Sequence, residues 1–106
     1  MMSIVTTGPD TGYYVDVFRS RKERGGDKMH DYFYHNLGQS MTLTAVDGTD
    51  LNLQPTEELA FAGADLYAYS YLYDKKMAAT NKDVKATFTI DMKDKGGDDI
   101  YMNLWM

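Results

Sequence analysis

The sequence of 106 residues has the length of one domain, because independently folding domains cluster near about 100–150 residues. Hydrophobic residues make up 43% of it and charged residues 25%, which excludes a mainly disordered chain and predicts a packed core. The 11 Lys and Arg residues against 16 Asp and Glu residues give a net charge of −5. This sign disfavours nucleic acid as a partner, since the phosphate backbone requires a basic surface.

Other classes of protein are disfavoured by what the sequence lacks. No apolar run approaches the ~20 residues of a membrane-spanning helix, so we expect no membrane partner. The start Met1-Met2-Ser3 has neither the basic nor the apolar region of an export signal, which predicts a soluble chain and leaves its localisation open. With no Cys and only two His, the sequence predicts no metal site and no bound cofactor.

Alternation of aromatic and polar residues predicts strands rather than helices, because these side chains fit a half-buried pleated surface. The first predicted strand spans residues 13–19, with Tyr14 and Phe18 on one face. A charged segment with two Gly at 21–27 predicts a hairpin loop. A second strand is then expected over residues 29–36. One of its faces carries His30, Tyr32, Tyr34 and Asn36, and the other carries Met29, Asp31, Phe33 and His35.

The middle of the chain contains a second predicted hairpin. Residues 41–46 and 51–53 flank Asp47-Gly48, a dipeptide typical of tight turns between strands. Thr56 and the two Glu residues that follow predict a helix of one or two turns, because Thr is a good N-cap and Glu is tolerated in the first turn.

The last part of the chain again alternates. Residues 67–73 have Tyr at every second position, a period that would scatter the rings around a helix, so a strand is expected there. A polar loop over 75–83 precedes a predicted strand over 84–91. A turn at 93–98 and a final strand over 100–106 complete the series.

These elements predict an all-β fold in which residues 1–106 form a single β domain. About seven short strands separated by turns of hairpin length are typical of an antiparallel β-sandwich or a curled sheet.

Several of these motifs together resemble a known family. The motifs are similar to the C-terminal β-sheet region of heparinase II/III-like proteins, polysaccharide lyases that include alginate lyases. They are VDVFR at 15–19, GG at 25–26, HDYFYH at 30–35, GADLYAYSYLYDKK at 63–76 and the terminal YMNLWM. The resemblance covers most of the chain in order. It implies a protein with a helical toroid and a β-sandwich region that cleaves an acidic polysaccharide by β-elimination, in the periplasm or after secretion.

The chain departs from that family in the parts that carry the chemistry. A chain of 106 residues is too short for the toroid, and it has no His-X-His segment. No catalytic or zinc-binding residue is therefore transferred to this sequence. We expect the chain by itself to be a non-catalytic β domain, without lyase activity, that shapes or supports the binding of an acidic polysaccharide.

Candidate substrate-binding residues lie around the first hairpin. On a strand, His30 and His35 face opposite sides, so one metal ion could not reach both. Asp31 shares the face of His35, where a carboxylate more often orders the strand surface than performs acid–base chemistry. Arg19 could clamp a sugar carboxylate or pair with a neighbouring Asp. The candidate binding residues here are Arg19, His30, Tyr34 and His35.

The Tyr stripe adds the candidates Tyr67, Tyr69 and Tyr71. Such a row of rings could stack on sugar units, or it could pack within the core. An alternative function is therefore a free-standing carbohydrate-binding or protein-interaction domain. We also expect a homo-oligomer through the terminal strands, with Trp105 as its anchor, because a hydrophobic edge strand invites a partner.

Overall fold

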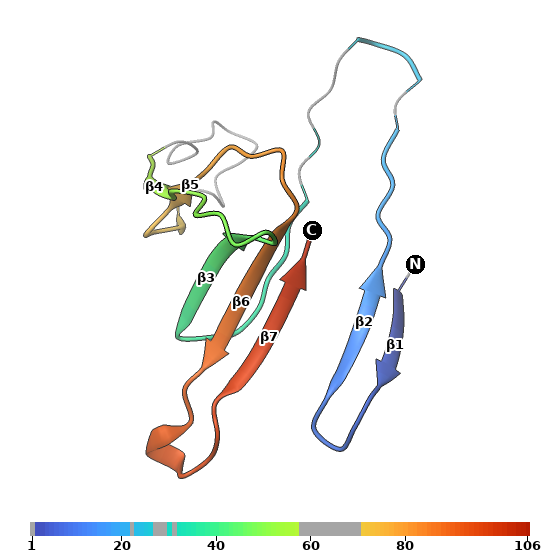
Figure 1. Ribbon diagram of the computed structural model, residues 1–106. Coiled ribbons are helices and arrows are strands. Elements are labelled where there is room, and N and C mark those ends of the chain that lie inside the picture. The colour runs from blue at the N-terminus through green and yellow to red at the C-terminus, as the bar shows by residue number, and fades with distance from the viewer. Residues whose placement is uncertain (1, 22, 27–29, 31, 58–70) are drawn as a thin grey trace. The chain divides into compact units, whose positions relative to one another are not determined.

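The computed structural model describes residues 2–21, 23–26, 30, 32–57 and 71–106 (Figure 1). The chain divides into two compact units, residues 1–34 and residues 35–106. The first unit contains a two-stranded antiparallel sheet, and the second contains a three-stranded and a two-stranded antiparallel sheet.

The first unit contains a β-hairpin at its start. Strand β1 (Met2–Thr6) pairs antiparallel with β2 (Gly12–Asp16), and Ile4 lies opposite Tyr14. The backbone N–H groups of Thr7 and Gly8 both donate to the carbonyl of Thr11, which closes the loop between the strands. The run Ile-Val-Thr of β1 consists of β-branched residues that suit a strand. Strand β1 was not among the strands predicted from the sequence.

The predicted hairpin of strands 13–19 and 29–36 is wrong as a backbone structure. Strand β2 ends at Asp16, and positions 30 and 32–36 are not in a strand. Strand β2 pairs with β1, with five residue pairs in register. Residues 27–29 and 31, which belong to the predicted second strand and its loop, lie outside the described residues.

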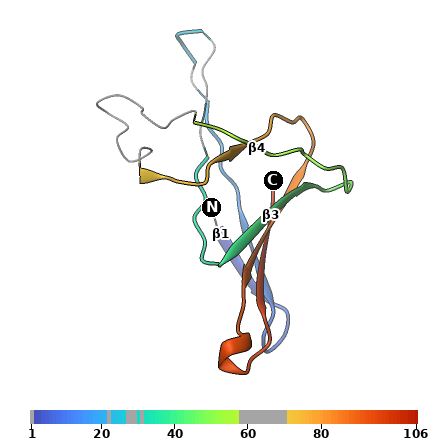
Figure 2. The same cartoon turned by 90° about the vertical axis from the view of Figure 1, so that its left-hand side faces the viewer.

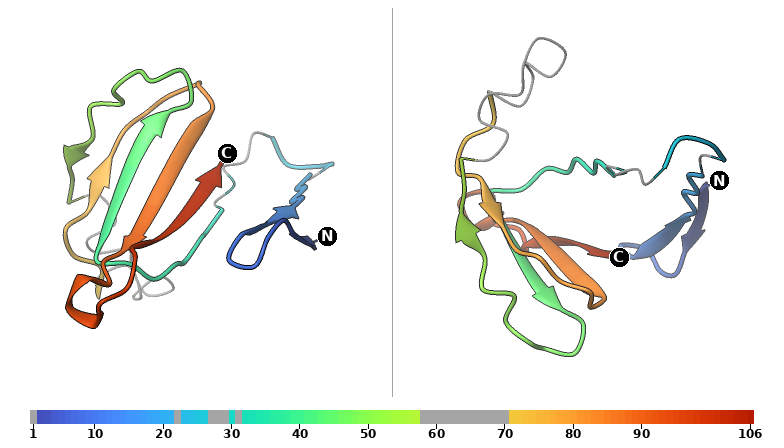
Figure 3. Two further views of the ribbon diagram at one scale, coloured as in Figure 1. Left: turned by 60° about the horizontal axis from the view of Figure 1, so that its bottom comes forward. Right: turned by 90° about the horizontal axis from the view of Figure 1, so that it is seen from above.

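The second unit contains a three-stranded antiparallel sheet. Its strands are β3 (Ser40–Ala45), β6 (Val84–Ile90) and β7 (Ile100–Trp105), in the order β3-β6-β7 (Figure 3). Leu43 lies opposite Ala86, which in turn lies opposite Leu104. These three strands confirm the expectations for residues 41–46, 84–91 and 100–106 to within one residue at each end.

The predicted hairpin partner of β3 at residues 51–53 is wrong. The Asp47-Gly48 turn does form, with Gly48 at a φ of 83° and its N–H donating to the carbonyl of Ala45. The chain then leaves β3, because Asn52 adopts a left-handed φ of 51°, which an extended strand does not allow. Strand β3 pairs with β6 instead, and the next strand, β4 (Gln54–Pro55), pairs with β5 (Lys76–Met77).

The period-two side-chain pattern gives the three-stranded sheet one apolar and one polar face. The apolar face carries Met41, Leu43, Ala45, Val84, Ala86, Phe88, Ile90, Ile100, Met102 and Leu104. Among the described residues only Ala45 and Ala86 are buried, at 2% and 4% exposure. The apolar side chains at the ends of this sheet, such as Met41 and Ile100, are about half exposed.

The connection between β6 and β7 is a short 3₁₀ turn, η2 (Lys93–Lys95), at the end of the β6–β7 hairpin (Figure 2). Gly96 follows it in the left-handed conformation, and its N–H donates to the carbonyl of Lys93. The turn predicted over 93–98 is therefore confirmed.

The predicted strand over 67–73 is wrong for its last residues, since Tyr71, Leu72 and Tyr73 are not in a strand. Its other residues lie outside the described part of the chain, as does most of the helix expected after Thr56.

The expected all-β fold class is confirmed. The described residues form seven strands, and every pairing between them is antiparallel. Within these residues, no helix is long and apolar enough to cross a membrane. The expectation of a single β domain over 1–106 stays a prediction.

Candidate functional site

The first unit brings together the side chains of residues 14–20 and 30–34. The hydroxyl oxygens of Tyr14 and Tyr34 are 2.6 Å apart, and the ring centroids of Phe18 and Tyr32 are 5.9 Å apart. The hydroxyl of Ser20 lies 2.9 Å from Nδ1 of His30. As residue numbers rise along one segment they fall along the other, so the two segments run antiparallel (Figure 1).

All of these side chains occupy even-numbered positions. The period-two alternation had placed Tyr14 and Phe18 on one face of the first segment, and His30 and Tyr34 on one face of the second. We call this surface the aromatic face. Its members are Tyr14, Asp16, Phe18, Ser20, His30, Tyr32 and Tyr34.

Two phenol groups of the aromatic face, those of Tyr32 and Tyr34, have raised pKa values. Burial, followed by the hydrogen bond with Tyr14, raises the pKa of Tyr34 to about 12. Burial and the neighbouring carboxylate of Asp16 also raise the pKa of Tyr32, whose hydroxyl donates to Asp16 Oδ2 at 3.3 Å. Both phenols are therefore protonated at neutral pH and can donate hydrogen bonds.

The aromatic face combines an apolar and a polar character. Tyr14 and Tyr34 are half-buried, whereas Phe18 and Tyr32 are exposed at 61% and 47%. Exposed rings with hydroxyl groups and a carboxylate beside them can stack on a sugar ring and hydrogen-bond to its hydroxyls.

Cationic side chains follow the aromatic face along the chain. Arg19, Arg21 and Arg24 are exposed, and Arg19 forms no ion pair with another described residue. The alternative pairing of Arg19 with Asp31 involves a residue outside the described ones. These three exposed guanidinium groups lie within six positions of the sequence, which also contain the exposed Glu23, in a chain whose net charge is −5. We call Arg19, Arg21 and Arg24 the basic patch.

The two His residues belong to different units of the chain. His30 belongs to the first unit and bonds with Ser20, whereas His35 is an exposed residue of the second unit. No group of three potential metal ligands occurs among the residues that the structure describes.

The Tyr stripe is only partly described. Tyr67 and Tyr69 lie outside the described residues. Tyr71 and Tyr73 are exposed at 83% and 89%, so these two rings are not part of a core.

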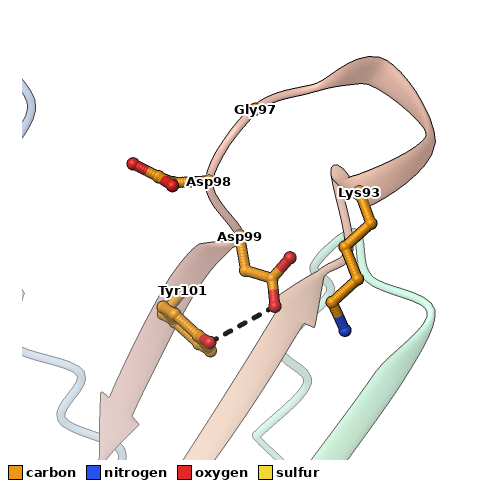
Figure 4. A pocket seen from close by; sticks show the side chains of 5 residues that line it. All are labelled: Lys93, Gly97, Asp98, Asp99 and Tyr101. Carbon is orange, nitrogen blue, oxygen red and sulfur yellow. Dashed lines mark hydrogen bonds between the residues drawn. The ribbon is translucent and has the colours of Figure 1, made fainter.

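A shallow hollow of about 360 Å³ lies at the β6–β7 connection (Figure 4). It is lined by Lys93, Gly97, Asp98, Asp99 and Tyr101. Asp99 accepts hydrogen bonds from the backbone N–H of Met92 and the hydroxyl of Tyr101, and Lys93 lies 3.6 Å from Asp91. Asp99 and Lys93 are therefore engaged in holding the turn, which gives this hollow a structural role. The Asp and Gly residues of this segment predicted a turn and did not predict a binding site.

The chain is similar to a curated protein described as an endo-acting ulvan lyase from Formosa agariphila. The two are 36% identical over 98 residues, which is 89% of this chain and 12% of the lyase. The chain thus spans about an eighth of the length of this relative. No family model matches the sequence, and no solved structure matches it. This similarity confirms the expected resemblance to a polysaccharide lyase.

Proposed function

We propose that this chain is a non-catalytic β segment related to polysaccharide lyases, and that its aromatic face and basic patch bind an acidic polysaccharide. The observation that carries the proposal is the similarity to an ulvan lyase along 89% of the chain. The finer relationship to the C-terminal β-sheet region of heparinase II/III-like lyases rests on the VDVFR, GG and HDYFYH motifs.

The aromatic face supports binding rather than catalysis. Elimination at a uronate needs a group that removes a proton near neutral pH and another that neutralises the carboxylate. The raised pKa values of Tyr32 and Tyr34 keep both phenols protonated at that pH. This surface also presents aromatic rings, hydroxyl groups and nearby Arg side chains. These are groups that can contact a glycan.

The substrate class also bears on where the protein works. A polysaccharide is too large and too polar to cross a membrane unaided, so we propose that the chain acts in the periplasm or after secretion. The polymer we propose is ulvan or a similar uronate glycan, taken from the name of the relative.

Electrophoresis in gels that contain ulvan tests the proposed binding. Replacement of Arg19, Arg21 and Arg24 by Ala should abolish the retardation that the unchanged chain shows, because the basic patch supplies the attraction to a polyanion. Replacement of Lys76, Lys93 and Lys95 by Ala removes the same charge elsewhere and serves as the matched control. Equal retardation of the two variants would contradict the proposal.

We further propose that the chain self-associates along β7. This strand lies at the edge of the β3-β6-β7 sheet, and its first residue Ile100 and the residue after its end, Met106, are each 53% exposed. An edge strand presents unpaired backbone groups that a second copy can pair with. Sedimentation at micromolar concentration should show a dimer or a higher oligomer, and a monomer throughout the concentration range would contradict this.

A further inference from the structure

The polar face of the three-stranded sheet consists of three cross-strand rows. The register places Thr44, Lys85 and Trp105 in the first row, Thr42, Thr87 and Asn103 in the second, and Ser40, Thr89 and Tyr101 in the third. We use the term polar face for these nine side chains. An antiparallel sheet commonly has one solvated face, so its polarity alone is ordinary.

Two large aromatic rings distinguish this polar face from an ordinary solvated surface. Trp105 is 60% exposed and Tyr101 is 59% exposed, and both lie on the same side of β7. Four residues along a strand separate the two rings by about 13 Å. This spacing suits a short oligosaccharide that stacks on both rings, since sugar C–H groups pack against aromatic faces.

The groups between and beside the rings are donors and acceptors. Five of the nine side chains are Ser or Thr hydroxyls, which can exchange hydrogen bonds with sugar hydroxyls. The hydroxyl of Thr87 donates to Oδ1 of Asn103 at 2.7 Å, so the amide is held in one orientation. The polar face therefore presents a fixed amide group in its central row.

The charge of the polar face indicates an anionic ligand. Lys85 is the one charged member among the nine, and its Nζ lies 5.5 Å from the centroid of the Trp105 ring. A single cation beside a stacking platform can pair with the carboxylate of a uronic acid. It is too little charge for a nucleic acid backbone, which requires several cations.

We propose that the polar face is a separate glycan-binding surface, on which Trp105 and Tyr101 stack on sugar rings and Lys85 pairs with a uronate carboxylate. This inference takes the class of ligand from the proposed function, but it uses no residue of the aromatic face or the basic patch.

Trp105 provides a direct probe of this surface, because it is the single Trp of the chain. Titration of the full chain with ulvan oligosaccharides should change the Trp105 emission in a saturable way and protect the ring from quenching by acrylamide. Neutral cello-oligosaccharides serve as the ligand without carboxylates and should bind more weakly.

Variants separate this surface from the rest of the molecule. Tyr101→Ala leaves the reporter in place and should weaken binding about tenfold, since it removes one of two stacking rings. Lys85→Met should bring the affinity for ulvan oligosaccharides close to that for the neutral ligand. Tyr73→Ala removes a ring that is 89% exposed outside the polar face and should leave the affinity unchanged. Circular dichroism checks that each variant retains its strands.

The outcomes distinguish the two proposals. An unchanged Trp105 signal, in a chain that ulvan gels still retard, would overturn the polar-face inference and leave the proposed function standing. Equal affinities for Tyr101→Ala and Tyr73→Ala would also overturn it. Absence of both the fluorescence change and the retardation would overturn both proposals.

Discussion

Tyr34 shows how the chemistry of a single residue is set by its neighbours. Its hydroxyl lies 2.6 Å from that of Tyr14, and the ring is half-buried, so the ionised phenolate is disfavoured. The pKa of Tyr34 is consequently raised to about 12. The same phenol is an effective donor to a sugar oxygen and an ineffective base at neutral pH, which is why we assign it to binding.

Alkaline pH should destabilise the first unit through Tyr34. A pKa raised above its usual value of 10.0 means that the stabilising contribution is fully present below pH 10 and is lost as the pH rises towards about 12. Tyr34→Phe should reduce this loss, and Tyr73→Phe should not. The measurement is amide exchange of residues 12–16 by NMR as a function of pH, and an identical alkaline loss in Tyr34→Phe would contradict the assignment.

Asp47 illustrates the opposite shift at the residue scale. The hydrogen bond from Lys82 at 2.8 Å, with further hydrogen bonds from Thr49, holds the pKa of Asp47 well below its usual range. The contact joins the turn after β3 to the loop before β6, so it helps to bring these paired strands into register. Both side chains are about half exposed, which limits its contribution to stability.

At the scale of elements, Gly38 and Gln39 anchor the chain that leads into β3. The N–H of Gln39 donates to the carbonyl of Thr89, and its side-chain Oε1 accepts from the N–H of Asp91. A Cβ at Gly38 would lie 2.9 Å from the carbonyl oxygen of Thr89, closer than real contacts allow. A side chain at this position would therefore separate the segment from the end of β6.

Gly38→Ala should destabilise the second unit by about 1–3 kcal/mol, because the clash is with backbone atoms that cannot move freely. Gly97→Ala is the matched control. Its Cβ would meet Met92 Cβ at 3.6 Å, an ordinary contact, and the expected change is within about 0.5 kcal/mol. Urea unfolding measures both, and equal midpoints for the two variants would show that the close approach of Gly38 to β6 is unimportant.

The elements also show what the sequence could and could not predict. Strands β3, β6 and β7 alternate strictly over six or seven residues, and this period was sufficient to locate them. Which strands pair was not predictable, because the strong turn at Asp47-Gly48 is followed by the left-handed Asn52. In the first unit the alternation assigned the members of the aromatic face to one face of each segment, but it did not predict β1, the strand that pairs with β2.

For the whole molecule, the central feature is the small amount of buried apolar surface. Only two described residues, Ala45 and Ala86, are buried, while aromatic rings are exposed in both units. Burial of apolar area is the main source of folding stability, and within the described part of the chain only these two small side chains are buried. A ligand that covers the exposed rings should stabilise the folded state in proportion to its binding.

We propose that the chain binds an acidic polysaccharide and does not cleave it. Size-exclusion chromatography with light scattering, on a mixture of the full chain and ulvan, tests both parts in one measurement. We expect the protein to elute together with ulvan and the molar mass of ulvan to remain unchanged. Elution of the protein apart from the polymer, or a decrease in the molar mass of ulvan, would contradict it.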